Sequence, residues 1–326
     1  MNSLPRVEAE VLPWHQPSWS RLEQMVADDH MPHGLLIAGP PHSGKHRIVN
    51  TLMRRLLCPA NDGPCGHCHQ CQLVDAGTHP DLFVVTLEDS KQIVIDQIRR
   101  LIEWASQTSQ QGGWKVCMIQ PADRMNIQSS NALLKILEEP PARTCIVLVS
   151  DQPNRLLPTL RSRCQRVECQ QPDRDVALTW LQRERPDVSD PALLLDIAGG
   201  VPLRAAEFIT EDYLALRKRL ASALGNMASA SFSPIQLAAT LNKVDPLDVL
   251  DILYQIMTDV IGFGLTAHAV CRNNDLTVEI VSIANHVNHE ACFRFIDRIN
   301  EAKTILGGTS NANVQMLFEW VLADDT

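Results

Sequence analysis

The segment GPPHSGKH, from Gly39 to His46, has most of the residues of a phosphate-binding loop. In such a loop, backbone N–H groups cradle phosphate oxygens, a lysine reaches the outer phosphates, and a Ser or Thr hydroxyl binds Mg²⁺. Gly39, Gly44 and Lys45 match the first two functions. His46 stands where the hydroxyl belongs, and Mg²⁺ prefers oxygen ligands. The pattern therefore predicts a phosphate loop whose metal site is defective.

A working site also needs acidic residues at the end of a later strand, where they hold the metal and orient water. In the segment KVCMIQPADRM, Gln120 and Pro121 occupy the positions where two carboxylates are expected. Asp123 lies just beyond, and we expect it to cap a helix or to face solvent. Because two catalytic parts are missing, we expect no ATP hydrolysis, and weak nucleotide binding or none at the loop.

A second candidate site is a cluster of four cysteines with the spacing C-x6-C-x2-C-x2-C: Cys58, Cys65, Cys68 and Cys71. Zinc is held tetrahedrally by four thiolates or by mixtures of thiolate and imidazole. Three histidines could replace a thiolate as ligand: His67, His69 and His79. Four thiolates already complete the shell, so we expect a structural zinc ion rather than a catalytic one. The six remaining cysteines are scattered along the chain.

Alternating apolar strand and helix patterns surround these residues. The apolar runs predict strands at 34–39, 81–87, 115–120, 144–150 and 166–170. Helical spacing predicts helices at 48–57, 95–106 and 129–139. Nearly all-apolar strands that alternate with helices are typical of a parallel sheet covered on both faces. The phosphate loop would then join the first strand to the helix that follows it.

From about residue 172 the strand patterns end and helical patterns continue to the C-terminus, with breaks at Gly199–Gly200 and in 229–234. We expect an α/β domain over 1–170 that contains the cysteine module at 58–71. A small helical domain over 171–212 and a larger helical domain over 213–326 would follow. At 326 residues the chain is long enough for these three parts.

Composition limits the function classes. The net charge of −9 argues against a protein that holds DNA mainly through its phosphates, unless other subunits contribute positive charge. The sequence has no apolar run near the ~18 residues that span a membrane. The segment MNSLPRVEAEVLPW lacks the basic and apolar regions of a secretory signal. We therefore expect a cytoplasmic protein without a membrane partner.

Several longer segments carry a family resemblance: CQLVDAGTHPDLFVV after the cysteines, SSNALLKILEEPP at 129–141, and VLVSDQPNRLLPTLRSRC at 147–164. Together they resemble the bacterial clamp-loader AAA+ proteins of the DNA polymerase III holoenzyme. The match is clear over roughly 30–170 and weaker towards the C-terminus. It implies a P-loop AAA+ domain with a zinc-binding insertion, a helical lid and an all-α collar that assembles the subunits.

The resemblance also implies roles for single residues. His46, Gln120 and Pro121 depart from the ATP-hydrolysing members of the family and fit its non-hydrolysing stator subunit. Arg163, in the segment Ser162-Arg163-Cys164, would be an arginine finger given in trans to ATP in a neighbouring subunit. A guanidinium group can stabilise charge on the transferring phosphoryl group.

Two further positions match the sensor residues of AAA+ proteins less well. Ser150 falls at the sensor-1 position, where in a site without catalysis we expect it to cap the strand. Arg204 is one residue away from the usual sensor-2 spacing, so we assign it no role.

The implied partners are the delta and tau/gamma subunits in a five-membered ring, the sliding clamp and, through the complex, primed DNA. ATP would be bound in partner subunits, and this chain would belong to a DNA-directed DNA polymerase holoenzyme without being catalytic alone. Two alternatives remain open at this point. One is an active ATPase in which Asp123 supplies the metal ligand, and the other is a zinc-dependent DNA-binding regulator.

Overall fold

The computed structural model describes residues 11–88, 90–228, 234–241, 243–266, 271–307 and 313–323. The chain divides into two compact units, Met1–Val176 and Ala177–Thr326. The boundary expected after residue 170 lies shortly before this division. The boundary expected after residue 212 falls inside helix α10 (Glu211–Ala228). The break expected in 229–234 lies outside the described residues, apart from residue 234.

The described part of the first unit contains one sheet of five parallel strands in the order β2-β3-β4-β1-β5. The strands are β1 (Gly34–Ala38), β2 (Leu82–Val85), β3 (Lys115–Ile119), β4 (Thr144–Ser150) and β5 (Gln165–Glu168). All five predicted strands are confirmed, and their bounds agree to within two residues. β1, β3 and β4 are buried along their whole length, because both faces of the sheet are covered.

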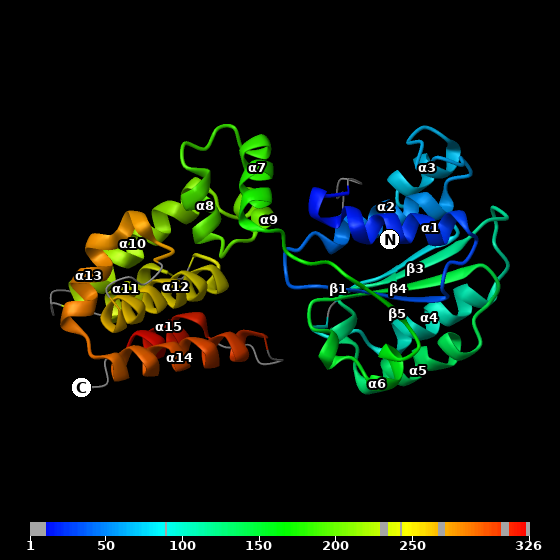
Figure 1. The fold of residues 1–326 in the computed structure, drawn as a ribbon. Helices are drawn as coiled ribbons and strands as arrows, with labels where there is room; N and C mark the ends of the chain where they lie inside the picture. The colour runs from blue at the N-terminus through cyan, green and yellow to red at the C-terminus, as the bar shows by residue number, and fades with distance from the viewer. Residues whose placement is uncertain are drawn as a thin grey trace. The chain divides into compact units, whose positions relative to one another are not determined.

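Helices cover the two faces of this sheet (Figure 1). Helices α1 (Gln16–Ala27) and α2 (Lys45–Leu57) lie on one face, and α4 (Ile95–Ser106), α5 (Ile127–Glu138) and α6 (Pro158–Arg161) lie on the other. Short 3-10 helices lie at Pro13–His15, Ala122–Arg124 and Pro153–Arg155. Strand β1 shows why two cores form, because successive side chains of a strand point to opposite faces. Leu35 and Ile37 join the α1/α2 core, while Leu36 and Ala38 join the α4/α5 core.

Lys115, the first residue of β3, is a buried cation with a structural task. Its side chain is 4% exposed, and Nζ donates to the carbonyl oxygens of Trp104, of Ala105 at 3.4 Å and of Gln107 at 2.7 Å. These carbonyls end helix α4, where the last C=O groups lack partners within the helix. Nζ also lies 4.3 Å from the centre of the Trp104 ring. Lys115 therefore joins the end of α4 to the sheet.

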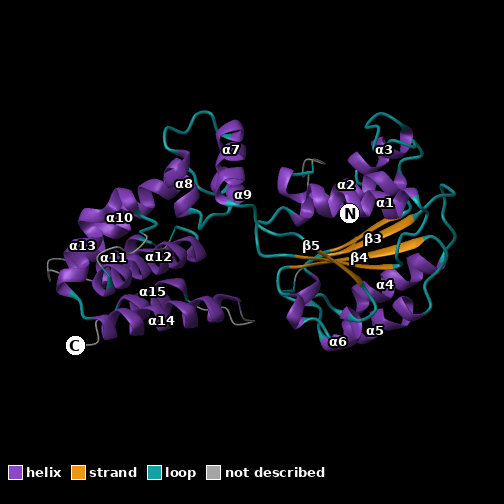
Figure 2. Cartoon of the chain, viewed as in Figure 1, coloured by secondary structure: helices purple, strands orange, loops and turns teal. Residues whose placement is uncertain are grey.

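In the described residues of the second unit, helices are the regular secondary structure, and Figure 2 shows them joined by loops. Its helices are α7 (Arg174–Glu184, which begins in the first unit), α8 (Pro191–Ile197), α9 (Pro202–Glu207), α10, α11 (Pro234–Thr240), α12 (Pro246–Leu265), a short 3-10 helix (Asn274–Leu276), α13 (Thr277–His286), α14 (His289–Gly307) and α15 (Val314–Leu322). Gly199 and Gly200, the predicted break, have positive φ values and separate α8 from α9. No described helix has the length and apolar character that crossing a membrane would need.

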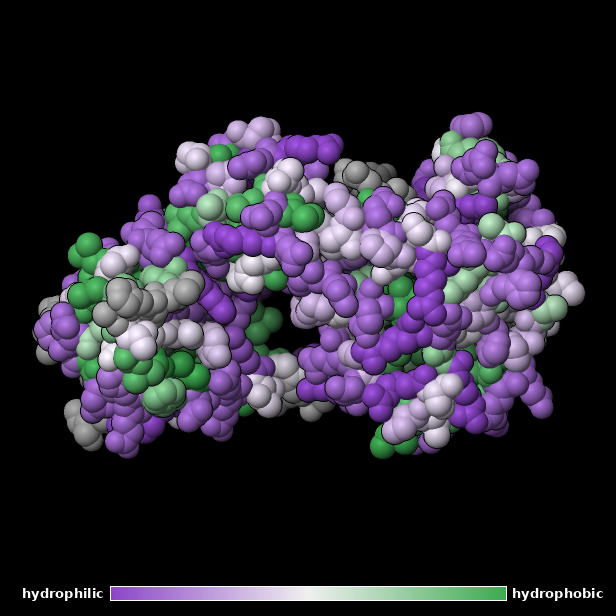
Figure 3. Space-filling model, viewed as in Figure 1, coloured by the Kyte–Doolittle hydropathy of each residue, from purple (hydrophilic) through white to green (hydrophobic). Residues whose placement is uncertain are grey.

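A buried polar network holds the helical unit together. Arg217 on α10 is 1% exposed, and it donates to Asn273 Oδ1 at 2.8 Å and to Asp275 Oδ2 at 2.5 Å. Asp259 on α12 accepts a hydrogen bond from the Asn273 backbone N–H at 3.0 Å. The network links α10 to α12 and to the loop before α13. Figure 3 shows apolar areas on the visible face of this unit, and Phe293 and Met316 are among its exposed apolar side chains.

Replacing Lys115 tests the role of this buried cation. Lys115→Met should lower the free energy of unfolding by about 2 kcal/mol, because three carbonyls lose a charged donor. Lys135→Met, an exposed lysine on α5, is the matched control and should change it by less than about 0.5 kcal/mol. Urea titration of the full chain measures both values. Equal changes in the free energy of unfolding for the two substitutions would contradict the structural role assigned to Lys115.

Candidate functional site

The predicted phosphate loop lies between β1 and α2, at the carboxyl edge of the sheet. Gly44 adopts a left-handed φ of 87° immediately before α2 begins at Lys45, a conformation that favours glycine. A Cβ atom on Gly39 would lie 2.3 Å from the carbonyl oxygen of Cys169, so only glycine fits there. The strand-loop-helix context expected from the sequence is therefore present. This edge of a parallel sheet is where such folds bind ligands.

The side chain of Lys45 folds back into its own loop. Nζ donates to the carbonyl oxygens of Gly39 at 2.8 Å and Pro40 at 2.6 Å, and it lies 2.7 Å from Oδ1 of Asp151. A fourth contact, to Ser43 Oγ, is longer at 3.2 Å. The side chain is 2% exposed. An ammonium group has three N–H donors, so the cation expected to reach a phosphate is already fully engaged inside the protein.

Asp151 is brought to Lys45 by the order of the strands. Ser150 ends β4, and β4 lies between β3 and β1. Asp123, just after β3, accepts hydrogen bonds through Oδ1 from Ser150 Oγ at 2.7 Å and from the Asp151 N–H at 3.2 Å. Asp123 thus fixes the end of β4, instead of capping a helix or standing free in solvent. Ser150 Oγ also accepts from the Gln152 N–H at 3.1 Å, as a strand cap would.

The two positions that depart from an ATPase pattern contact each other. Nε2 of Gln120, directly after β3, lies 2.9 Å from Nε2 of His46 in the first turn of α2. Pro121 follows Gln120 and carries no ligand group. The side chains that stand at the expected metal-ligand positions therefore form a hydrogen bond of their own. None of the three offers a carboxylate or hydroxyl oxygen for Mg²⁺.

The sequence patterns did not identify two residues at this site. Asp151 directly follows Ser150 at a strand end, a signal that becomes clear once β4 is placed beside β1. His15 lies behind the loop with its side chain fully buried, and burial lowers the pKa of His15 to about 4. His15 is therefore neutral at pH 7 and adds no positive charge for an anion.

The four predicted cysteines come together beside α3 (His69–Asp75). Their Sγ atoms all lie within 4.8 Å of one another, and three of the separations are 3.7, 3.9 and 4.0 Å. Four thiolates around an ion with bonds of about 2.3 Å would be about 3.8 Å apart, so the donor set fits a tetrahedral metal. Backbone N–H groups of His67 and Cys68 lower the pKa of Cys65 to about 6. Burial raises the pKa of Cys71 to about 12.

Arg163 lies far from the phosphate loop, just before β5. Its backbone carbonyl lies beside Gly34, the first residue of β1, whereas the loop follows the last residue of β1. The length of a five-residue strand, about 16 Å, therefore separates the two. Arg163 Nη2 forms an ion pair with Glu138 Oε1 at 2.7 Å, and Nη1 donates to the Thr159 carbonyl at 3.0 Å. The guanidinium is partly exposed and is held by these two contacts.

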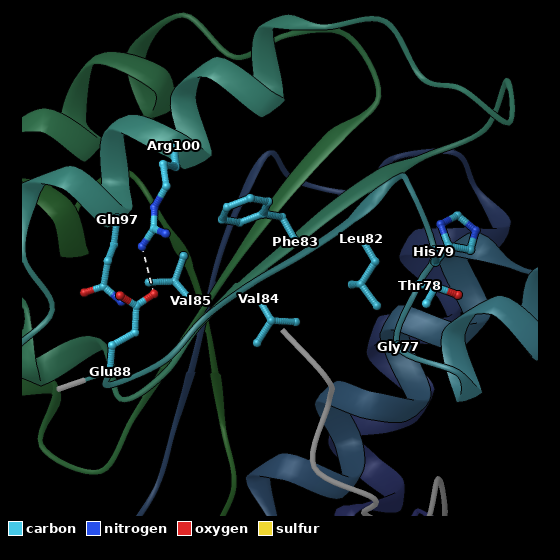
Figure 4. A pocket seen from close by; sticks show the side chains of 10 residues that line it. All are labelled: Gly77, Thr78, His79, Leu82, Phe83, Val84, Val85, Glu88, Gln97 and Arg100. Carbon is cyan, nitrogen blue, oxygen red and sulfur yellow. Dashed lines mark hydrogen bonds and ion pairs between the residues drawn. The ribbon is translucent and has the colours of Figure 1, made fainter. Parts of the chain in front are cut away.

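A separate hollow of about 370 Å³ lies beside β2 (Figure 4). Two of its charged or polar side chains are engaged with protein atoms: Arg100 contacts Glu88 at 2.8 Å, and Gln97 Nε2 donates to the Thr86 carbonyl at 2.7 Å. Phe83 is among the apolar residues that line it. Of the predicted candidates it contains His79, the alternative zinc ligand, and none of the four cysteines or the phosphate-loop residues.

Arg204 lies in the helical unit and forms an ion pair with Asp251 of α12 at 3.0 Å. Asp251 also contacts Lys303 of α14 at 2.6 Å. This group of charges joins α9 to the helices that follow and gives Arg204 a structural partner.

Two family profiles match the chain. One described as DNA polymerase III, delta subunit, matches residues 14–173, and one described as the C terminal part of that subunit matches residues 211–324. The DNA polymerase III subunit delta' of Pseudomonas aeruginosa is 38% identical over 272 residues, which is 79% of this chain and 82% of that protein. The same subunit of Escherichia coli is 34% identical over 281 residues, 85% of this chain and 83% of that protein.

Among solved structures, a DNA polymerase III gamma subunit-related protein of Thermotoga maritima matches with a TM-score of 0.51. It is 18% identical, and the match covers 94% of this chain and 97% of that one. This likeness shows a shared fold. The two curated relatives match over most of their length and of this chain. The chain belongs to the DNA polymerase III subunit delta' family.

Proposed function

We propose that this chain is a non-hydrolysing stator subunit of a bacterial clamp loader. It assembles with delta and tau/gamma subunits in a ring of five and supports ATP-dependent loading of the sliding clamp on primed DNA in the cytoplasm. The helical second unit supplies the lid and the collar. The acidic net charge of −9 agrees with partners that are mainly proteins.

One observation carries this proposal: the phosphate loop and Arg163 lie at opposite edges of the same sheet. Arg163 cannot reach an anion at its own loop, but it can face the loop of a neighbouring subunit. The ion pair with Glu138 does not prevent this, because both side chains are partly exposed. An exposed pair of this kind contributes about 0–1 kcal/mol, far less than a guanidinium contributes at a phosphoryl-transfer site.

The alternative of an ATPase active in its own right has less support. Asp123, the acid that would hold its metal, is engaged with the end of β4. Lys45 is engaged with its loop and with Asp151. ATP is therefore assigned to the partner subunits.

We also propose that the cysteine module holds one structural zinc ion. Four sulfur donors suit zinc, and a complete thiolate shell leaves no open position for catalysis. Helix α3 begins within the module, and Cys68 Sγ accepts the Cys71 N–H at its start. Metal binding would fix α3 against α2. An ion pair between Arg54 of α2 and Asp75 of α3 also joins these two helices.

Arg163→Ala tests the arginine finger. In a complex reconstituted with delta and tau/gamma subunits, it should lower clamp-stimulated hydrolysis at the neighbouring site by about 10³-fold, because that site loses a charge that stabilises its transition state. Assembly, measured by gel filtration, should be unchanged. Arg161→Ala, two residues away, is the matched control and should keep full ATPase activity. Unchanged hydrolysis in the Arg163 variant would refute the assignment.

Metal analysis tests the zinc assignment. The purified chain should contain one zinc ion, and Cys65→Ser or Cys68→Ser should lose it, because three remaining thiolates bind more weakly. Cys292→Ser removes a thiol in α14, outside the cluster, and should retain the ion. Stoichiometric zinc in the Cys65 and Cys68 variants would show that these cysteines are not the ligands.

A further inference from the structure

The contact between Lys45 and Asp151 closes the phosphate loop from the side of β4. We infer that Asp151 excludes polyphosphates from the loop by occupying the ammonium group that would otherwise bind them. The inference rests on the proposed function and deepens it, since it names the residue that keeps nucleotide from this subunit. The altered metal-ligand positions would account for the proposed lack of hydrolysis, but by themselves they leave the loop and its lysine able to hold an anion.

The geometry shows Asp151 occupying a donor of Lys45 that a phosphate would otherwise use. Its Oδ1 lies 2.7 Å from Lys45 Nζ, and the two carbonyl oxygens of Gly39 and Pro40 take the other donors. The side chain of Asp151 is 42% exposed whereas that of Lys45 is 2% exposed, so solvent reaches the carboxylate and hardly reaches the ammonium group. A phosphate that approaches from solvent meets this carboxylate before it can reach Nζ.

The negative charge of Asp151 adds a second reason why polyphosphates are excluded from the loop. An incoming polyphosphate must break the contact between Lys45 and Asp151 and must then lie beside the displaced carboxylate. Two like charges about 4 Å apart near a protein surface repel strongly enough to weaken binding by at least about tenfold. Removing the charge of Asp151 would relieve this repulsion and weaken the contact that holds Lys45 Nζ.

Neighbouring contacts hold both partners in place. The backbone N–H of Asp151 donates to Asp123 Oδ1 at 3.2 Å, which fixes the end of β4. The loop is held from outside by Trp14 Nε1, which lies 3.4 Å from the Ser43 carbonyl. The lysine and the carboxylate are therefore kept in contact by two independent parts of the fold.

The test is binding of inorganic tripolyphosphate and of ATP to the full chain without Mg²⁺, measured by isothermal titration calorimetry. Asp151→Asn keeps the side-chain shape and the backbone hydrogen bond, and it should bind both probes at least about tenfold more tightly than the wild type. Asp29→Asn removes the same charge from an exposed pair with Arg143 and should bind as the wild type does. Asp151→Ala provides the same comparison should the Asn variant fail to fold.

The double variant Lys45→Ala/Asp151→Asn shows where the gained affinity comes from, and it should return to wild-type binding. An Asp151 variant that binds no better than the wild type would overturn the inference, as would a gain that survives the loss of Lys45. The titration uses this chain alone and no ATP turnover. Its failure is therefore distinguishable from failure of the Arg163 proposal, which is measured in the assembled complex.

Discussion

The ammonium group of Lys45 has three donors, and the arrangement of the carboxyl edge of the sheet depends on what fills them. Two loop carbonyls and the Asp151 carboxylate take these places within 2.8 Å. A buried cation is stable only when it is paired and hydrogen-bonded, so the loop, α2 and the end of β4 are held together by one group. Lys45, which would bind phosphate in an ATPase, stabilises the fold in this chain.

The parallel sheet separates two candidate features of the first unit, the phosphate loop and Arg163. Because all five strands run in the same direction, the loop after β1 and the segment before β5 must lie at opposite edges. Arg163 consequently lies at the opposite edge from its own loop, where in the proposed function a neighbouring subunit would meet it. In the proposed function, one subunit can therefore support hydrolysis in a neighbour without carrying out any itself.

Local patterns were sufficient to predict much of this molecule. The five strands, the loop at Gly44 and the cysteine cluster follow from apolar runs, a glycine turn and short spacing, which are all local in sequence. The contacts of Lys45 with Asp151 and of Gln120 with His46 join segments that are far apart. These contacts depend on the strand order β3-β4-β1. The alternation of strand and helix patterns in the sequence does not determine that order. The expectation that Asp123 caps a helix or faces solvent is wrong for the same reason, because its partner Ser150 lies on β4, the next strand of the sheet.

The central claim is that this chain supports ATP use without holding ATP. Equilibrium binding of labelled ATP to the delta and tau/gamma subunits, reconstituted with and without this chain, tests it when clamp-stimulated turnover is measured on the same samples. Adding the chain should raise turnover while the number of ATP molecules bound per complex stays the same. An additional bound ATP in the complex that contains this chain would contradict it.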